Sequence, residues 1–490
     1  MSARVASAAL VGMDARPVEV EVALVPGLPE VQIVGLASGA VREAKQRLKA
    51  AVPNAGEQWP NTRVTISLAP SDIRKDGSLL DLPMAMGVLC ASGSVDQDDL
   101  IDKWFIGELA LDGRVRGVRG ALAVAISCRS AGKTLILPRD NSAEAALVEG
   151  LDVVGVETLT EALAFVAGGM EAPPVFAKPS SHRTAVPDLS DVKGQALGRR
   201  CLEIAAVGGH NALMVGPPGS GKTMLARRLV GILPPMDAEE TLEVTRIWSV
   251  AGLLPVGVGC IGDRPFRSPH HHASAAAICG GGSPTPRPGE ISLAHRGVLF
   301  MDEMPLFSRG VLDSLRQPME EGCITVARHG GTHRFPASFS LIGAANPCPC
   351  GPRTARCNCA PGRLEMYRSK LSGPLTDRFD LHVEVPRLND EELLELGASE
   401  PSSVVARRVC EAMEFRSKRP EVASARELLA SLDSDGRSFL RSAFRDVVAS
   451  ARALDRTLKV ARTIADLSAS ERIEVDHLAE ALQFRKEAWS

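Results

Sequence analysis

The residue types best suited to chemistry lie in one glycine-rich stretch near the middle of the chain. It reads Gly216-Pro217-Pro218-Gly219-Ser220-Gly221-Lys222-Thr223, and a helical pattern begins at Met224. Glycines let consecutive backbone N–H groups converge on phosphate oxygens, Lys222 adds a positive charge, and the Thr223 hydroxyl can ligate Mg²⁺. The spacing matches GxxxxGK[ST] between a strand-like and a helix-like run, which is the context that the motif requires. The sequence therefore predicts a loop that binds the phosphates of ATP rather than an ordinary glycine-rich turn.

Two adjacent acids and one amide follow apolar runs further along the chain. The run 298–301 ends in Asp302 and Glu303, and the run 339–344 is followed by Asn346. We predict that Asp302 holds the hydration shell of Mg²⁺, that Glu303 activates the attacking water, and that Asn346 senses the γ-phosphate. Alone, the acids could cap a solvated strand end and an Asn-Pro pair could be only a turn. The phosphate loop favours the catalytic interpretation.

Four cysteines come directly after Asn346. Cys348, Cys350, Cys357 and Cys359 are spaced C-x-C-x6-C-x-C. Four thiolates in so short a segment can meet the tetrahedral requirement of Zn²⁺. The alternative is a loop of reduced thiols, because the CxC spacing is tighter than the commoner CxxC. We predict a structural zinc site.

The elements that position these residues divide the chain into three domains and a linker. Residues 1–170 mix alternating apolar runs with helical periods, as expected for one α/β domain. A segment rich in Pro and Ser, 171–186, has the composition of a linker. Short apolar strands separated by helices predict a parallel sheet within 187–390, and helical spacing alone continues through 391–490.

Composition excludes several classes of protein. The chain has 490 residues, 45% of them apolar and 23% charged, which is typical of globular domains rather than disordered or membrane proteins. It has no long apolar run and no signal-type N-terminus, so we expect a cytoplasmic protein without a membrane partner. The 56 Lys and Arg nearly balance 59 Asp and Glu, so any binding of nucleic acid needs a local basic surface.

With these motifs in place, the chain resembles the magnesium-chelatase-like AAA+ ATPases, and specifically the YifB/ComM family. Segments along nearly the whole chain carry the resemblance: Ile33-Val34-Gly35-Leu36, Asp191-Val192-Lys193-Gly194-Gln195, Arg264-Pro265-Phe266-Arg267, Pro288-Gly289-Glu290-Ile291-Ser292, Leu315-Arg316-Gln317-Pro318, Asn346-Pro347-Cys348-Pro349-Cys350-Gly351 and Val460-Ala461-Arg462-Thr463-Ile464. The resemblance implies an N-terminal Lon-protease-like α+β domain of the ribosomal S5 domain 2-like fold. It also implies a three-layer αβα P-loop core and a C-terminal helical lid.

The same resemblance implies a function and partners. It points to a homo-oligomeric ring, expected to be a hexamer, that hydrolyses Mg-ATP. For ComM it implies a helicase that migrates branches in DNA during the recombination of incoming DNA. A chelatase-type or chaperone-like ATPase that remodels a protein partner is the alternative. Against that alternative, the chain lacks the DxSxS motif of the chelatase partner subunit.

In such a ring, residues of one subunit complete the active site of the next. Arg378 matches the position of the arginine finger, although it could instead form a surface ion pair with Asp377 or Asp380. Arg452 resembles the sensor 2 arginine of the lid, with Arg456 and Arg462 close by at helical spacing.

DNA contacts are expected in a hairpin just before the third core strand. The runs 323–328 and 332–335 read as two short strands, which in related rings would point into the pore. Arg328, His329 and Arg334 are the candidates, and an ordinary solvated turn is the alternative. Another insert carries Arg264, Arg267 and the run His270-His271-His272. We expect it to be a pore element, an element coupled to the nucleotide, or simply an exposed turn.

An active protease is a third possibility, because Lon-like sites pair a serine with a lysine base. Ser78 lies roughly where that serine would be, but the segment 113–125 contains no lysine. We therefore expect Ser78 to be a structural turn residue in a non-catalytic domain.

Overall fold

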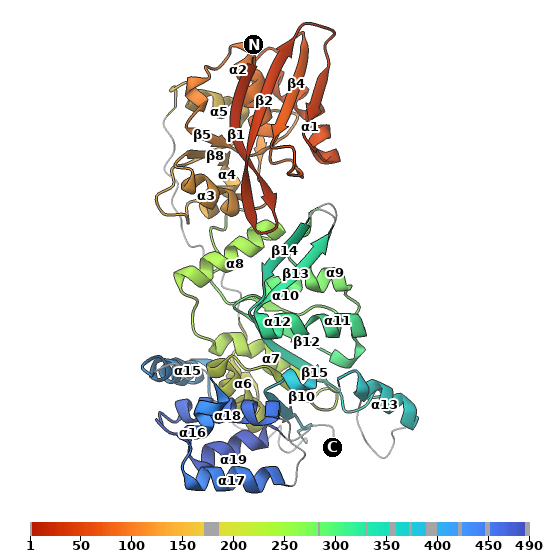
Figure 1. Ribbon diagram of the computed structural model, residues 1–490, viewed down its shortest axis with the longest axis vertical. Helices are drawn as coiled ribbons and strands as arrows, with labels where there is room; N and C mark the ends of the chain where they lie inside the picture. Colours follow the sequence, from red (N-terminus) through yellow and green to blue (C-terminus); the bar gives the residue numbers. More distant parts are fainter. Residues whose placement is uncertain are drawn as a thin grey trace.

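A computed structural model describes residues 2–170, 186–282, 285–328, 331–351, 359–371, 375–388, 399–419, 424–445 and 451–485. The molecule is elongated, with an N-terminal sheet at one end, a second sheet near the middle and a group of helices at the other end (Figure 1).

A seven-stranded sheet organises the N-terminal region, in the order β3-β4-β2-β1-β5-β8-β9. Its longest ladder is antiparallel and pairs β1 (Ser2–Val11) with β2 (Asp14–Val25). Along β2, Val18, Val20 and Val22 are buried while Glu19 is exposed, as expected for a strand with one face against a core. The remaining elements are β3 (Val31–Val34), α1 (Gly39–Asn54), β4 (Arg63–Ala69), α2 (Asp81–Ser92), β5 (Lys103–Phe105), β6 (Glu108–Leu109), β7 (Val115–Arg116), α3 (Ala121–Ser130), β8 (Thr134–Pro138), α4 (Arg139–Ala145), β9 (Val153–Val156) and α5 (Leu159–Val166).

The central region contains the predicted parallel sheet, in the order β11-β12-β15-β10-β16. Every residue of β10 and β12 is buried, which explains why these strands read as continuous apolar runs. The strands are β10 (Ala212–Val215), β11 (Phe266–Arg267), β12 (Val298–Met301), β15 (Ser340–Ala345) and β16 (Leu381–Glu384). A separate hairpin joins β13 (Cys323–Arg328) to β14 (Gly331–Pro336), as predicted.

Helices cover the central sheet and make up the C-terminal region. The central helices are α6 (Ala196–Gly208), α7 (Lys222–Leu229), α8 (Ala238–Ala251), α9 (Ala275–Cys279), α10 (Glu290–Leu293), α11 (Arg309–Ser314), α12 (Arg316–Glu321) and α13 (Pro361–Ser369). The C-terminal helices are α15 (Ser402–Ser417), α16 (Ala425–Ser431), α17 (Ser434–Arg445), α18 (Ala451–Leu467) and α19 (Val475–Gln483). Buried residues of α6, β10 and the C-terminal helices form one hydrophobic cluster. The C-terminal region therefore packs on the central region rather than around a core of its own.

The N-terminal sheet meets the central region through the turn between β1 and β2. Arg246 of α8 donates to the carbonyl oxygen of Met13 at 2.7 Å and pairs with Asp14. The Gly120 amide donates to the Ser249 carbonyl at 2.9 Å. These contacts tie α8 to the N-terminal region. Within the described ranges, no helix combines the length and the apolar character needed to cross a membrane.

Candidate active site at the edge of the central sheet

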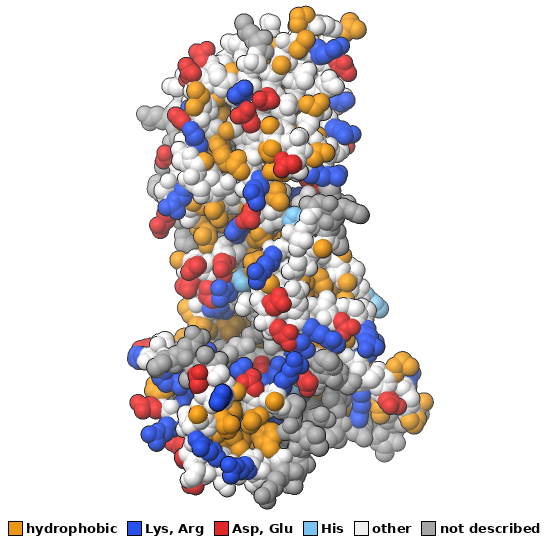
Figure 2. Space-filling model, viewed as in Figure 1, with side chains coloured by type: hydrophobic (Ala, Val, Ile, Leu, Met, Phe, Trp, Pro, Cys, Tyr) orange, Lys and Arg blue, Asp and Glu red, His pale blue; other side chains and the backbone are white. Residues whose placement is uncertain are grey.

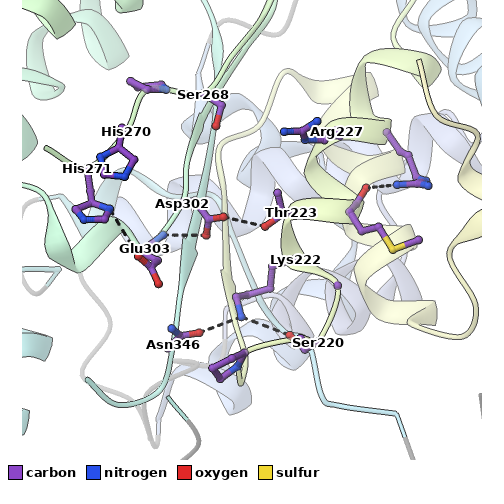
Figure 3. A pocket seen from close by; sticks show the side chains of 16 residues that line it. Ser220, Lys222, Thr223, Arg227, Ser268, His270, His271, Asp302, Glu303 and Asn346 are labelled. Carbon is purple, nitrogen blue, oxygen red and sulfur yellow. Dashed lines mark hydrogen bonds and ion pairs between the residues drawn. The ribbon is translucent and has the colours of Figure 1, made fainter. Parts of the chain in front are cut away.

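The phosphate loop, the two predicted acids and Asn346 meet at the carboxyl edge of the central sheet. The strand β15 lies between β10 and β12, so the phosphate loop after β10, Asn346 after β15 and the acids after β12 all emerge side by side. Open parallel sheets bind ligands at this edge. The residues line a cleft of about 820 Å³ (Figure 3), a volume suited to a nucleotide. Its lining consists of Pro218, Gly219, Ser220, Gly221, Lys222, Thr223, Met224, Arg227, Arg228, Ser268, Pro269, His270, His271, Asp302, Glu303 and Asn346.

Glycine is required in the phosphate loop for two different reasons. Gly219 and Gly221 adopt φ values of +77° and +95°, which residues with a side chain rarely adopt. Gly216 has no space for a side chain, because a Cβ there would lie 2.1 Å from the carbonyl oxygen of Val385. Gly216 therefore allows the loop to pass close to the chain that follows β16. The helix α7 begins directly after Gly221, so its N-terminal amides face the cleft.

Lys222 is buried at the base of this loop. Its ammonium group donates to the carbonyl oxygens of Gly216 at 2.7 Å and Pro217 at 2.9 Å, and to the Asn346 side-chain oxygen at 3.2 Å. Burial lowers the pKa of Lys222, and the charges of Asp302 and Glu303 oppose that shift. The ammonium group thus links the phosphate loop to Asn346 at the end of β15.

The geometry around Thr223 fits a magnesium ion. The Thr223 hydroxyl donates to Asp302 Oδ2 at 2.8 Å. Octahedral Mg²⁺ with ligands at about 2.1 Å separates neighbouring ligand oxygens by about 3 Å. The two oxygens are therefore placed so that one ion, or its hydration shell, can take up both. When bound, Mg²⁺ would neutralise charge on the phosphates of ATP.

Glu303 points away from Asp302 although the two residues are adjacent. Its backbone adopts φ +48°, in the left-handed region, and its amide donates to Asp302 Oδ1 at 2.9 Å. The Glu303 carboxylate faces His271, with 3.6 Å between Oε2 and the imidazole Nδ1 (Figure 3). One acid therefore faces the hydroxyl that can bind the metal, and the other is free of that task and can act as a base.

The cysteine segment lies against the phosphate loop. The Sγ atoms of Cys348 and Cys350 are 3.3 Å apart, and Cys359 has its Sγ within 4.8 Å of both. Cys357, the fourth predicted ligand, lies outside the described residues. A Cβ on Gly351 would lie 2.9 Å from the Pro218 ring, so this turn packs directly on the phosphate loop.

Tyr367 of α13 contacts Asn346, the residue just beyond the end of β15. Its hydroxyl donates to the Asn346 carbonyl oxygen at 3.2 Å, and burial raises its pKa to about 12. The three thiols of the preceding segment form a donor set that can hold a metal ion, and they lie beside the phosphate loop.

Arg378 lies in a second cleft of about 640 Å³ at the opposite, amino edge of the same sheet. It is buried, and its guanidinium group donates to Glu320 Oε1 at 2.5 Å. Five further basic residues line this cleft, together with three acids: Arg416, Arg419, Arg456, Lys459 and Arg462, with Glu320, Asp380 and Asp466. On the face shown in Figure 2, Lys and Arg side chains are numerous at the level where the central region meets α18.

The structure separates the candidate arginines of α18. Arg456 lies 3.3 Å from Asp380 and lines the second cleft, as does Arg462. Arg452 is exposed at the start of the helix and is not part of that lining. Burial raises the pKa of Asp380, but His210 and Arg456 more than compensate and hold it below its ordinary value. The sensor 2 assignment of Arg452 stays a prediction. Unlike Arg452, Arg456 lines the same cleft as Arg378.

The candidate DNA-binding hairpin lies beside the N-terminal region. The Arg334 guanidinium donates to Cys323 Sγ at 2.9 Å and is otherwise exposed. His333 of the same strand packs against Gly12 in the turn between β1 and β2. Arg328 ends β13, but its side chain lies outside the described part of the chain, as does His329. The assignment of DNA contacts here stays a prediction.

The other predicted insert residues have different roles. Arg264 donates to the Arg296 carbonyl at 2.7 Å and to Glu240 at 2.8 Å, and Arg267 pairs with Glu290 at 2.6 Å. These contacts attach the segment 264–267 to α8, to α10 and to the residue Arg296. His270 and His271, in contrast, line the nucleotide cleft.

In the N-terminal region, Ser78 donates to the Glu108 carboxylate. Lys75 donates to the Pro70 carbonyl, and Lys133 pairs with Asp102 at 2.7 Å. Each of these three side chains thus has a structural partner.

Sequence reasoning missed Arg227, Arg228, Ser268 and Pro269 as cleft residues and did not connect His271 to Glu303. Arg227 lies four residues after Thr223, about one helical turn further along α7, so its place could have been found from the helical period. The pairing of His271 with Glu303 depends on β11 lying next to β12, which no local pattern reveals.

The parallel sheet and the residues at its carboxyl edge are those of a P-loop nucleotide-binding protein, and the family models that match the chain identify it as an AAA+ ATPase of the magnesium-chelatase class. Three family models match the chain: "Magnesium chelatase, subunit ChlI" over 188–393, "Subunit ChlI of Mg-chelatase" over 20–141, and "Magnesium chelatase, subunit ChlI C-terminal" over 399–485.

Relatives that match nearly the whole chain give the particular family. The YifB proteins of Salmonella typhimurium and Escherichia coli are each 42% identical to it, over 97% of this chain and 96% of theirs. The competence protein ComM of Haemophilus influenzae is 41% identical over 98% of this chain and 96% of its own. A magnesium-chelatase 67 kDa subunit of Heliobacterium mobile is 28% identical over 42% of this chain. The chain belongs to the YifB/ComM family of magnesium-chelatase-like proteins.

Proposed function

We propose that this chain forms an ATP-driven ring that acts on DNA as a branch-migration helicase in recombination or transformation. One observation carries the ATPase part: Lys222, Thr223, Asp302, Glu303 and Asn346 meet in a single cleft at the carboxyl edge of the sheet. The similarity to the competence protein ComM supports the DNA part. ATP is the substrate, and Mg²⁺ is the cofactor that Thr223 and Asp302 would share.

The placement of the two clefts supports a ring. The nucleotide cleft lies at the carboxyl edge of the central sheet, and the arginine-lined cleft lies at its amino edge. When identical subunits associate head to tail, opposite faces meet, and such an association closes into a ring if the rotation permits. Arg378 of one subunit would then approach the phosphates held by the next, where an arginine stabilises charge in the transition state. In this arrangement Arg456, which lines the same cleft as Arg378, would face the same phosphates.

ATP hydrolysis measured with and without DNA tests the function. We expect four-way or forked DNA to stimulate hydrolysis by the full-length protein and to be unwound or migrated, with Lys222→Ala as the inactive control. A rate of ATP hydrolysis that does not change with DNA but rises with a protein partner would overturn the DNA assignment. That result would favour the chelatase-type remodelling alternative, which the similarity to a magnesium-chelatase subunit supports.

We also propose that Cys348, Cys350 and Cys359 hold a structural zinc ion, with Cys357 as the fourth ligand expected from the sequence. The proximity of three thiols supports this assignment. Elemental analysis of protein purified without chelators should find about one zinc per subunit. Cys350→Ser should lower the zinc content, while Cys410→Ser, at an exposed cysteine of α15, should not. Folded protein with far less than one zinc per subunit would contradict the site.

The N-terminal region is proposed to be a Lon-protease-like domain without protease activity. The structural partners of Ser78, Lys75 and Lys133 support this assignment. Cleavage of unfolded substrates that is lost on Ser78→Ala would contradict it.

A further inference from the structure

Glu303, the proposed general base, faces a histidine that belongs to a different loop. His271 Nδ1 lies 3.6 Å from Glu303 Oε2, and Figure 3 shows the two side chains turned toward each other on the side of the cleft opposite α7. At this separation the two polar groups are neighbours, although the distance is just beyond the length of a hydrogen bond.

The strand order brings these residues together. The ladder between β11 and β12 is parallel and pairs Phe266 with Val298 and Arg267 with Leu299. The loops that follow both strands therefore leave the sheet at the same edge. The loop after β11 contributes Ser268, Pro269, His270 and His271 to the wall of the nucleotide cleft.

Neighbouring rings fix the orientation of His271. Its ring centroid lies 4.2 Å from that of His270 and 4.4 Å from that of His272. The Phe307 ring meets it edge to face at 6.4 Å. The side chain of His271 is 22% exposed. A ring that is already packed loses little further conformational freedom when it orients another group.

Glu303, in contrast, needs a partner that orients it. Its side chain is 47% exposed, so without a contact it would sample several rotamers. A general base acts only when its oxygen comes within hydrogen-bond reach of the water whose proton it takes. Whatever holds the carboxylate at the wall of the cleft therefore raises the fraction of enzyme in which it is ready to act.

We propose that His271 is a positioning residue for Glu303. It holds the carboxylate on the β11 side of the cleft, from where Glu303 can take a proton from the water that attacks the γ-phosphate. This inference rests on the proposed ATP hydrolysis and is independent of the DNA assignment.

Hydrolysis without DNA by the full-length protein is the measurement. His271→Phe keeps a ring against Phe307 but removes the polar contact, and we expect kcat to fall about tenfold. Binding of a fluorescent ATP analogue should change by less than about twofold, because the phosphate loop is untouched. His271→Asn retains an N–H donor and should restore part of the rate. His272→Phe is the matched control, because His272 does not line the cleft and a phenylalanine keeps a ring beside His271, so its kcat should stay at the wild-type value.

A double substitution tests whether His271 acts through Glu303. In single-turnover experiments, His271→Phe should add no further loss to Glu303→Gln, because the group that it positions is already gone. A wild-type kcat in His271→Phe, a loss explained entirely by weaker ATP binding, or an additive loss in the double variant would each overturn the inference. A wild-type rate in Glu303→Gln, or no hydrolysis by the wild-type protein, would instead refute the proposed function from which it follows.

Discussion

The two edges of the central sheet are built in different ways. The carboxyl edge takes its main groups from three short segments, each directly after a buried strand, and brings opposite charges together around Lys222. The amino edge collects residues from α12, the end of α15, α18 and the segments before β10 and β16, with an excess of basic side chains. The first edge has the groups needed to bind and cleave ATP. The second edge has cations that fit a partner with negative charge, which in the proposed ring would be the neighbour's nucleotide.

The largest expected effect tests whether the amino edge of one subunit acts on the carboxyl edge of the next. Arg378→Ala should lower ATP turnover by about a thousandfold, while ATP binding stays near the wild-type value. Mixing Arg378→Ala with Lys222→Ala subunits should restore part of the activity, because a mixed ring contains interfaces with an intact Lys222 facing an intact Arg378. Steady-state hydrolysis across mixing ratios measures this rescue. Mixtures that stay inactive, although they assemble, would place Arg378 outside the neighbour's site.

A substitution at the carboxyl edge should act within one subunit. Glu303→Gln should lower kcat by about a hundredfold or more, because the amide cannot take the proton from water. ATP affinity should remain, since Lys222 and the loop amides are unchanged. Equilibrium binding and single-turnover hydrolysis measure the two quantities. Glu239→Gln on the exposed side of α8 serves as the control and should hydrolyse ATP at the wild-type rate.

A finer test compares two arginines of the same helix. Arg456→Gln should lower turnover by about tenfold, because its guanidinium group lines the second cleft beside Asp380. Arg452→Gln should change turnover by less than about twofold, because its side chain is exposed outside that cleft. The reverse order of effects would restore the sequence-based assignment of sensor 2 to Arg452.

The last prediction concerns stability rather than turnover, at His382 near the amino edge. Burial, assisted by the charges of Arg485 and Arg456, lowers the pKa of His382 to about 4. The unfolded chain binds a proton near pH 6.5, whereas the folded chain binds it only near pH 4. Stability should therefore be complete above about pH 6.5 and fall as the pH decreases toward 4, by up to about 1.4 kcal/mol per pH unit.

Urea denaturation at several pH values measures this slope. His382→Asn should flatten the decline between pH 6.5 and 4, whatever its effect on absolute stability. The exposed His272→Asn should leave the slope unchanged. Parallel curves for His382→Asn and the wild-type protein would show that His382 does not cause the decline.

Much of the carboxyl edge could be predicted because each motif is local. Strand β10, strand β12 and the hairpin lie at the predicted residues. Buried parallel strands appear in a sequence as continuous apolar runs, and a hairpin appears as two short strand-like runs separated by a short turn that contains glycine. The motifs assigned both Thr223 and Asp302 to Mg²⁺, and the structure places the two side chains in contact. The contact of His333 with Gly12 could not be predicted, because it depends on how the hairpin meets the N-terminal sheet.

The sequence by itself determined that a loop ending at Thr223 can hold phosphates and that acids follow a buried strand, because these properties depend on backbone torsions and side chains within a few residues. Only the tertiary structure decided that His271 faces Glu303, that Arg456 rather than Arg452 joins Arg378, and that the two clefts lie at opposite edges of one sheet. The physical reason is packing between elements that are far apart in the sequence. Hydrophobic periodicity encodes which residues of a strand or helix are buried but not which element lies beside it: His271 meets Glu303 because β11 pairs with β12, and Arg456 reaches the second cleft because of how α18 packs on α6.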